Sequence, residues 1–257
     1  MEASELKVSV LAAEARDRLG FSQTEPIENI FKTLSVEGVW LVRYPFQMQS
    51  ISALYTRCRE QPIIAIDSSY TLGHQTFSAA HEIYHWLHDG DRLYSVCSPG
   101  ETETGNTRSG EHTADRFASE FLMPEQGIKR RLARRLGDNQ DIEVTDVFFL
   151  QQFYRVSFEA MLRRLRDLDI LNAMRYRTFR EAVSGNIKTL ARQLGYPLDL
   201  YIADMAIEYP PDFIEMATKL YETGRISWMR LCELMAWVGI DPVSLELRHP
   251  EDPDHVV

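Results

Sequence analysis

The chain has 257 residues, 44% of them hydrophobic, which is enough apolar content for one or two domains with a substantial core. Lys and Arg number 28 and Asp and Glu 38, so the formal net charge is −10, which argues against general affinity for nucleic acid. The three cysteines are widely spaced and predict reduced thiols rather than a Cys-ligated metal. No signal-peptide pattern and no apolar run of about 20 residues occurs, which predicts a soluble, cytoplasmic protein without membrane contact.

The first 66 residues alternate between helical and strand-like patterns. Apolar residues at helical spacing predict a helix over residues 6–19 that Gly20 ends, and Thr24, Glu25 and Pro26 predict the start of a second helix. Runs rich in β-branched and aromatic residues predict strands at residues 39–44, 51–56 and 62–66.

We expect these strands to form a small mixed sheet packed beside the helix that follows. An edge strand of such a sheet can bind a peptide in extended form, so residues 53–57 are a candidate substrate rim. An ordinary sheet position without substrate contact is the alternative.

Residues 77–88 follow a continuous helical pattern without Gly or Pro and contain the motif H-E-x-x-H. In an α-helix, residues four apart lie one turn above each other, so His81 and His85 present two imidazoles to one point. That geometry suits a tetrahedral zinc ion, which in catalytic sites keeps one position for water. Glu82 is placed beside this water, where its carboxylate can act as general base in peptide hydrolysis. A buried helix with hydrogen-bonded histidines is the alternative interpretation.

A polar connection rich in Gly and Pro over residues 89–110 leads to a second helical pattern, which Pro124 ends. Glu111 and Asp115 lie one turn apart on one stripe of this helix. Glu111 can therefore bind the metal while Asp115 accepts a hydrogen bond from the far N–H of a ligand histidine. Two solvated acids at a helix start, where carboxylates suit the dipole, are the alternative.

Two other histidines are rival ligands. His88 shares the stripe of His81 and His85, and His112 is next to Glu111. Both rank below Glu111, because a third imidazole on the same helix does not easily converge at tetrahedral angles. Either one is also a candidate for stabilising an oxyanion, a role that the sequence does not assign.

Together, the two helical segments resemble the ImmA/IrrE family of zinc metallopeptidases. The resemblance rests on H-E-x-x-H at residues 81–85 and on E-x-x-A-D-x-F-A-x-x-x-L-M-P at residues 111–124. Weaker likeness extends through residues 63–67 and 156–165. Two positions depart from the family pattern, with Tyr84 where members usually have Gly and Thr76 where a basic residue is common. Neither change removes a ligand, so activity is still expected.

The resemblance implies a zinc-dependent endopeptidase, with one zinc ion per chain held by His81, His85 and Glu111 in a layout similar to that of thermolysin-type enzymes. Mn²⁺ or another divalent ion is an alternative metal. It also implies that the substrate is a helix-turn-helix transcriptional repressor, whose cleavage releases its genes in stress responses or in mobile-element or toxin–antitoxin regulation. The competing hypothesis is a metal-stabilised regulatory module that sequesters a partner or binds DNA without cleaving anything.

Residues 129–180 carry a net positive charge, unlike the rest of the chain. Within them, residues 147–153 predict one helix, and Ser157 predicts the cap of a second helix that ends at Leu168. This arrangement resembles a helix-turn-helix, with Arg163, Arg164 and Arg166 as candidate DNA contacts. DNA binding is not favoured, because arginines also solvate helix faces and the whole chain is acidic.

The predicted fold class is α+β, with a small mixed sheet packed on the H-E-x-x-H helix and a mainly helical C-terminal part. Helical patterns continue beyond residue 181, where Ser227 predicts the cap of a late helix and Gly224 the end of the one before it. The predicted divisions are a metallopeptidase domain at 1–126, a basic helical segment at 127–180, a C-terminal helical domain at 181–248 and a flexible tail at 249–257.

Overall fold

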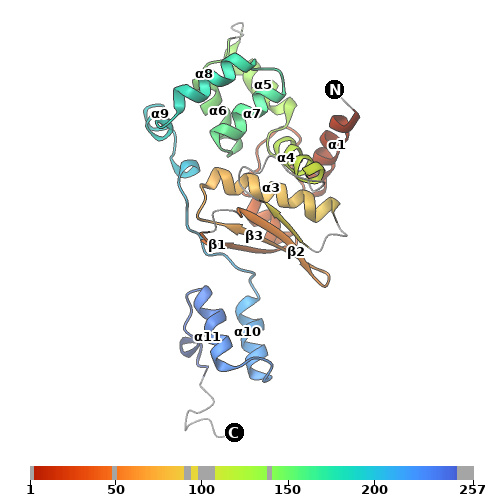
Figure 1. Ribbon diagram of the computed structural model, residues 1–257, viewed down its shortest axis with the longest axis vertical. Coiled ribbons are helices and arrows are strands. Elements are labelled where there is room, and N and C mark those ends of the chain that lie inside the picture. Colours follow the sequence, from red (N-terminus) through yellow and green to blue (C-terminus); the bar gives the residue numbers. More distant parts are fainter. Residues whose placement is uncertain (1–2, 48–50, 90–93, 98–107, 138–140, 248–257) are drawn as a thin grey trace. The chain divides into compact units, whose positions relative to one another are not determined.

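The computed structural model describes residues 3–47, 51–89, 94–97, 108–137 and 141–247. The chain forms two compact units, Met1–Ala206 and Ile207–Val257, which are labelled by element in Figure 1. The predicted divisions at residues 126 and 180 both fall within the first unit, and they stay predictions. The predicted tail at 249–257 lies outside the described residues.

The first unit contains a four-stranded sheet with the strand order β1-β3-β2-β4. Strands β1 (Trp40–Tyr44) and β3 (Gln61–Asp67) are parallel, whereas β2 (Ala53–Cys58) runs antiparallel to both β3 and β4 (Tyr94–Cys97). Alternate residues of β1 are buried, as expected for strands with one face on the core. Helix α3 (Leu72–His88) packs on the sheet (Figure 1). The α+β class and the mixed sheet are therefore confirmed.

Two sequence-based expectations about the sheet are wrong. The candidate substrate rim at residues 53–57 belongs to β2, which is an inner strand because β3 and β4 pair with its two edges. Strand β4 also lies within residues 89–110, which were predicted to be a continuous connection. Tyr94 and Val96 of β4 favour a strand locally, but Gly, Pro and polar residues dominate the pattern of residues 89–110 and conceal it. Pairing of the β4 backbone with β2 fixes the strand.

The bounds of the two N-terminal helices agree only partly with the sequence-based expectation. Helix α1 (Ala3–Arg18) ends before Gly20, whose φ of +72° is a conformation that favours glycine. The second helix was predicted to open near Thr24, but α2 (Ile30–Val36) begins later, where the Asn29 side chain accepts a hydrogen bond from the Lys32 N–H.

The backbone before α2 is held by other contacts. The carbonyl of Thr24 accepts a hydrogen bond from the Tyr154 hydroxyl at 3.2 Å, and the carbonyls of Ser22 and Glu25 accept from Arg16. These long-range bonds replace the helical ones, and a sequence pattern does not reveal them.

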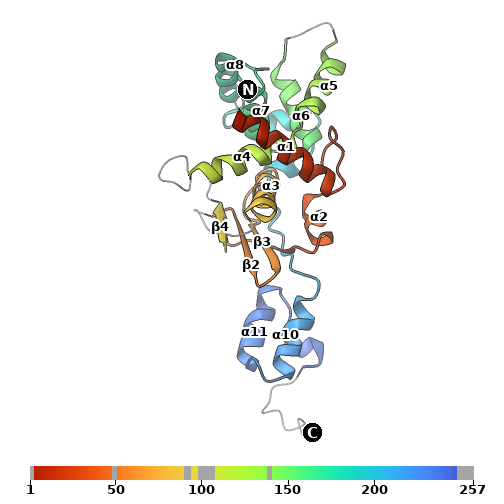
Figure 2. The same cartoon turned by 90° about the vertical axis from the view of Figure 1, so that its right-hand side faces the viewer.

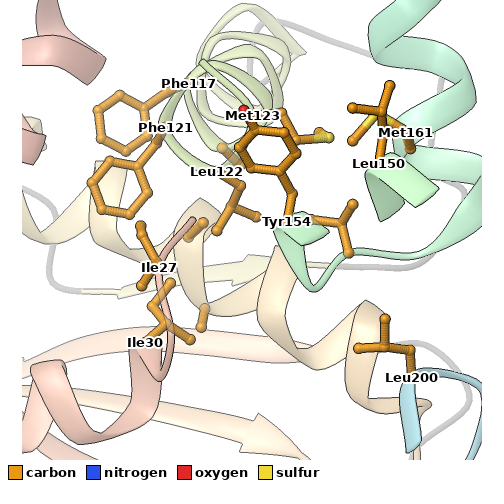
Figure 3. Close-up of a cluster of buried hydrophobic side chains, with 14 of the residues drawn as sticks. Ile27, Ile30, Phe117, Phe121, Leu122, Met123, Leu150, Tyr154, Met161 and Leu200 are labelled. Carbon is orange, nitrogen blue, oxygen red and sulfur yellow. The ribbon is translucent and has the colours of Figure 1, made fainter. Parts of the chain in front are cut away.

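The remaining helices of the first unit build one core with the elements above. They are α4 (Arg108–Leu122), α5 (Glu125–Leu136), α6 (Val144–Tyr154), α7 (Phe158–Asp167), α8 (Ala173–Val183), α9 (Ile187–Gln193) and the short η1 (Asp199–Tyr201). The Ser157 side chain caps α7 as predicted, accepting from the Ala160 N–H. Figure 3 shows side chains of α2, α4, α6, α7 and η1 meeting in the buried cluster.

Two buried arginines hold the C-terminal end of α4. The Arg16 guanidinium, 1% exposed, donates to the Phe121 carbonyl, and Arg164 Nε donates to the Met123 carbonyl at 3.0 Å. The last carbonyls of a helix have no partner within the helix, so these donors satisfy groups that would otherwise be buried without one. Arg164 also forms a two-pronged ion pair with Glu120, at 2.9 and 2.5 Å. Because Arg16 comes from α1 and Arg164 from α7, the end of α4 is fixed from two sides.

The start of α3 is held by the segment that follows η1. The Leu72 N–H donates to the Ile202 carbonyl at 3.1 Å, and the Ser68 hydroxyl donates to the Ala206 carbonyl at 2.8 Å. Below them, the buried Gln75 amide bridges Arg43 and Asp204. The start of the H-E-x-x-H helix thus depends on residues far away in the sequence.

The second unit is a small helical hairpin. Its helices are α10 (Phe213–Glu222) and α11 (Trp228–Trp237), both labelled in Figure 2, and the short η2 (Pro242–Leu245) follows them. Ser227 caps α11 and Gly224, at φ +69°, follows α10, as predicted. Ala217, Leu231 and Met235 form its core. Within the described part of the chain, no helix combines the length and the apolar composition needed to cross a bilayer.

Replacing Arg164 by Met should lower the free energy of unfolding by about 3–5 kcal/mol, because the Glu120 carboxylate would stay largely buried without its cation. Chemical denaturation monitored by circular dichroism measures this change. Arg163→Met is the matched control. The Arg163 side chain is 61% exposed in its pair with Glu159, so its loss should cost less than about 1 kcal/mol. Equal costs for the two variants would contradict the role given to Arg164.

Candidate metal centre

Helix α3 places two imidazoles side by side in the protein interior. His81 and His85 are 2% and 0% exposed, and their Nε2 atoms lie 3.2 Å apart. The helical run has no Gly or Pro after Gly73, so it stays regular through both histidines. Glu82 is fully buried on the same helix. Burying three such polar side chains is costly unless something binds them.

Helix α4 brings Glu111 to this pair. Its Oε2 atom lies 3.1 Å from His81 Nε2 and 3.7 Å from His85 Nε2. Ligand atoms 2.0–2.1 Å from a tetrahedral zinc ion are about 3.3–3.4 Å apart, close to the three distances found here. Two imidazoles and one carboxylate are also a ligand set of catalytic zinc sites. Among the described residues, His81, His85 and Glu111 form the group able to hold a metal ion. These residues therefore fit zinc.

Each histidine is oriented from behind by a second carboxylate. Asp115 Oδ1 lies 2.9 Å from His81 Nδ1, as the sequence suggested, and Asp89 Oδ2 lies 2.7 Å from His85 Nδ1. A carboxylate on Nδ1 keeps its proton there and leaves Nε2 free for a metal. Asp89 was missed by the sequence reasoning. Its spacing of four residues from His85, on the same helical stripe, was the available signal.

The electrostatics of the group favour a cation. Burial lowers the pKa of His81, but the hydrogen bonds with Asp115 and Glu111 and the charge of Glu82 outweigh it and raise the pKa to about 10. Burial raises the pKa of Glu111, but the hydrogen bonds with His81 and His85 dominate and lower it to about 2. The surrounding carboxylates therefore attract positive charge to His81, which a divalent ion can supply in place of a proton.

Comparison with known families agrees with this arrangement. A family model for the IrrE N-terminal-like domain, peptidase family M78, matches residues 34–166, more than half of the chain. The chain belongs to this ImmA/IrrE family. The matched region includes the sheet, α3 and α4, and so all three candidate ligands.

No curated protein matches the chain. A solved structure, a Mycobacterium tuberculosis transcriptional regulator, is similar with 15% sequence identity and a TM-score of 0.43, covering 62% of this chain and 46% of that chain. The chain thus spans less than half the length of that regulator.

The rival histidines lie outside the three-residue group. The His88 ring packs against Tyr84 and Phe117, with centroid distances of 5.3 and 5.6 Å. His112 lines a cavity together with His88. The Tyr84 ring meets the His85 ring edge-on, with a centroid distance of 5.5 Å. The oxyanion role considered for His88 and His112 stays a prediction.

The candidate DNA contacts do not share one exposed face. Arg164 is 3% exposed and occupied by Glu120, so the predicted DNA contact through Arg164 is wrong. Arg164 lies on the face of α7 that packs on the core, together with the buried Met161, Leu162 and Leu165. A charged side chain on this buried face needs a partner of opposite charge. Arg163 and Arg166 are exposed and pair with Glu159 and Asp167. DNA contact through these two stays a prediction.

Replacing Asp89 by Asn should weaken zinc binding about 10–100-fold, because an amide is a poorer acceptor for the N–H of His85. Competition titration against a chromophoric chelator measures the affinity. Glu60→Gln, which alters an exposed acid in a turn, is the matched control and should bind zinc as the unmodified protein does. Unchanged affinity in Asp89→Asn would show that the contact does not orient the ligand.

Zinc binding should release a proton near pH 7. In the metal-free protein, His81 keeps its proton until the pH rises to about 10, whereas zinc needs the neutral imidazole. Affinity should therefore increase between about pH 6 and pH 8, by up to about tenfold per pH unit. Isothermal titration calorimetry in two buffers of different ionisation enthalpy counts the released protons. A pH-independent affinity would contradict the coupling.

Proposed function

We propose that this chain is a zinc-dependent endopeptidase. One observation carries the proposal, namely that His81, His85 and Glu111 converge from two helices within ligand distance of one point, with Glu82 adjacent in sequence to His81. Both histidine rings are also fixed by carboxylates, which is the support that a working metal site needs. Zinc bound to these residues would supply a Lewis acid that polarises the peptide carbonyl and lowers the pKa of a water ligand.

The protein groups have separate tasks in this proposal. Glu82 accepts the proton of the attacking water and later donates it to the leaving amine. Its burial keeps the carboxylate in one orientation and limits competing solvation. Asp115 and Asp89 hold the two imidazoles in the tautomer that ligation requires. Glu111 is the more exposed ligand, at 34% of its side chain, so the centre opens toward solvent beside α4.

The proposed substrate is a helix-turn-helix transcriptional repressor, which membership of the ImmA/IrrE family supports. Hydrolysis at any accessible peptide bond would be harmful, so selectivity has to come from docking of that partner. A protease with such a substrate works in the compartment that holds the DNA, the cytoplasm. The free thiols of Cys58 and Cys232 fit a reducing environment.

Replacing Glu82 by Gln should keep zinc bound and reduce cleavage by at least about 100-fold, because Gln cannot accept the proton. The assay incubates zinc-loaded protein with the product of a neighbouring repressor-like gene, with and without chelator, and reads fragments by intact mass. Glu60→Gln is the control and should cleave normally. Full cleavage by Glu82→Gln would show that the base is assigned to the wrong residue.

The same assay separates the proposal from a non-cutting regulatory module. A repressor that stays intact but co-purifies with the zinc-loaded protein would support sequestration instead. A repressor that is cut only when the chelator is absent would support the peptidase.

A further inference from the structure

The second unit of the chain exposes more apolar side chains than its size accounts for. It supplies fewer than a fifth of the described residues. Of the twelve large hydrophobic side chains that are exposed among the described residues, five nevertheless belong to it, namely Ile207, Met229, Trp237, Val243 and Leu245. An excess of exposed apolar side chains is typical of a surface that binds another protein.

Two of these side chains lie on one face of α11. Met229, Glu233 and Trp237 follow one another at intervals of four residues, so they line one side of the helix over about 12 Å. Met229 is 72% exposed and Trp237 is 57% exposed. Met and Trp are also residue types that are enriched in protein–protein interfaces. We call these three residues the α11 stripe.

The α11 stripe faces away from the core of its own hairpin. In an α-helix, a residue two positions further along is turned by about 160° around the axis. Leu231 and Met235 each follow a member of the stripe by two positions, and both are fully buried. Helix α10 packs on this buried side, and the two helices lie side by side in Figures 1 and 2. The stripe is therefore left uncovered by α10.

The surface around the stripe is acidic. Residues 207–247 contain seven Asp and Glu and three Lys and Arg, a net charge of −4, and six of the seven acids are exposed. Glu233 belongs to the stripe itself, where Arg230 pairs with it at 2.8 Å. Helix α11 ends at Trp237, and the last carbonyls of a helix add partial negative charge at that end. The two apolar side chains thus lie in a negative field.

This charge decides between two kinds of occupant. A second copy of the hairpin would bring its own net charge of −4 against the first, and like charges repel. An α-helix with one apolar face flanked by Lys or Arg would instead bury Met229 and Trp237 and place its cations beside Glu233. A cation is also attracted to the face of a Trp ring. The charge around the stripe therefore favours a basic amphipathic helix.

We propose that the α11 stripe docks a basic amphipathic α-helix of a protein partner. The proposal rests on the proposed function in one respect, which is that this partner is the protein substrate. A helix-turn-helix repressor carries Lys and Arg where it contacts DNA, so it can supply such a helix. Docking at the second unit would provide the selectivity that peptide hydrolysis alone lacks.

The test measures binding of a labelled synthetic helix to the full chain by fluorescence anisotropy. The probe is an amphipathic peptide of about 18 residues, or five helical turns, with Leu on one face and Lys on the other. Chelator is present throughout, so neither zinc binding nor cleavage contributes. We expect binding that weakens when salt rises from about 50 to about 300 mM, because salt screens exposed charges. The same peptide with Glu in place of Lys should not bind.

Replacing Trp237 or Met229 by Ala should weaken binding of the Lys peptide about tenfold, because each change removes an apolar anchor of the stripe. Met174→Ala is the matched control. It removes a Met from α8 that is 76% exposed, so it should leave binding unchanged. Circular dichroism of each variant verifies that it is folded.

Weaker binding in either stripe variant, with Met174→Ala unchanged, supports the proposal. No binding of the Lys peptide, equal binding of the Glu peptide, or unchanged binding in both stripe variants would overturn it. Light scattering without peptide tests the second copy: a dimer that Trp237→Ala converts to a monomer would also overturn the proposal. A failure of repressor cleavage leaves these metal-free results unaffected, so the docking surface and the peptidase are tested separately.

Discussion

The fixed position of α4 is the constraint on which the candidate site depends. Its C-terminal end is held by Arg16 of α1 and Arg164 of α7, both buried and both donating to carbonyls that the helix itself leaves without partners. Glu111 lies near the other end of this helix, about three turns away. A small rotation at the anchored end would therefore move its carboxylate by several ångströms at the metal centre. The long-range contacts of Arg16 and Arg164 therefore help to position Glu111, although both arginines lie outside the metal centre.

The metal centre joins α3 and α4 at a place where their contact buries polar side chains, which is unfavourable unless those side chains are bound. His81 and His85 come from α3 and Glu111 from α4, and burial of the two imidazoles is costly without a partner such as Glu111 or a metal ion. Carboxylates lie on both sides of His81, at Nδ1 and at Nε2. When His81 is neutral, the negative charge of these two carboxylates is not balanced by the imidazole, so the site favours a bound cation. Binding a divalent ion would therefore stabilise the packing of α3 on α4 as well as provide chemistry.

Helix α3 has different functions on different faces. One flank packs on the sheet, the stripe with His81 and His85 meets α4, and Tyr84 and His88 line a cavity together with residues of α1 and α4. The aromatic ring of Tyr84 is the direct link between the last two, since it lines the cavity and contacts His85. A glycine at position 84, which the family resemblance led us to expect, would have no side chain to make this contact.

The sequence by itself determined what depends on neighbours a few residues apart. The pairing of His81 with His85 follows from helical spacing, the cap at Ser157 from one side chain and its own backbone, and the three predicted strands from local residue preferences. The convergence of Glu111 on the histidines was expected from its stripe on α4, but its distance from them depended on packing.

Tertiary structure decided the rest, because those features depend on partners distant in the sequence. Arg164 looked like a surface arginine until α4 supplied Glu120, 44 residues earlier, as its buried partner. Strand β2 became an inner strand only because β4 formed on its far edge, and the start of α2 moved because Arg16 and Tyr154 bound the backbone before it. A hydrogen bond or a strand pairing across the fold outweighs a local preference of a few tenths of a kcal/mol, and no local pattern encodes where such a partner will lie.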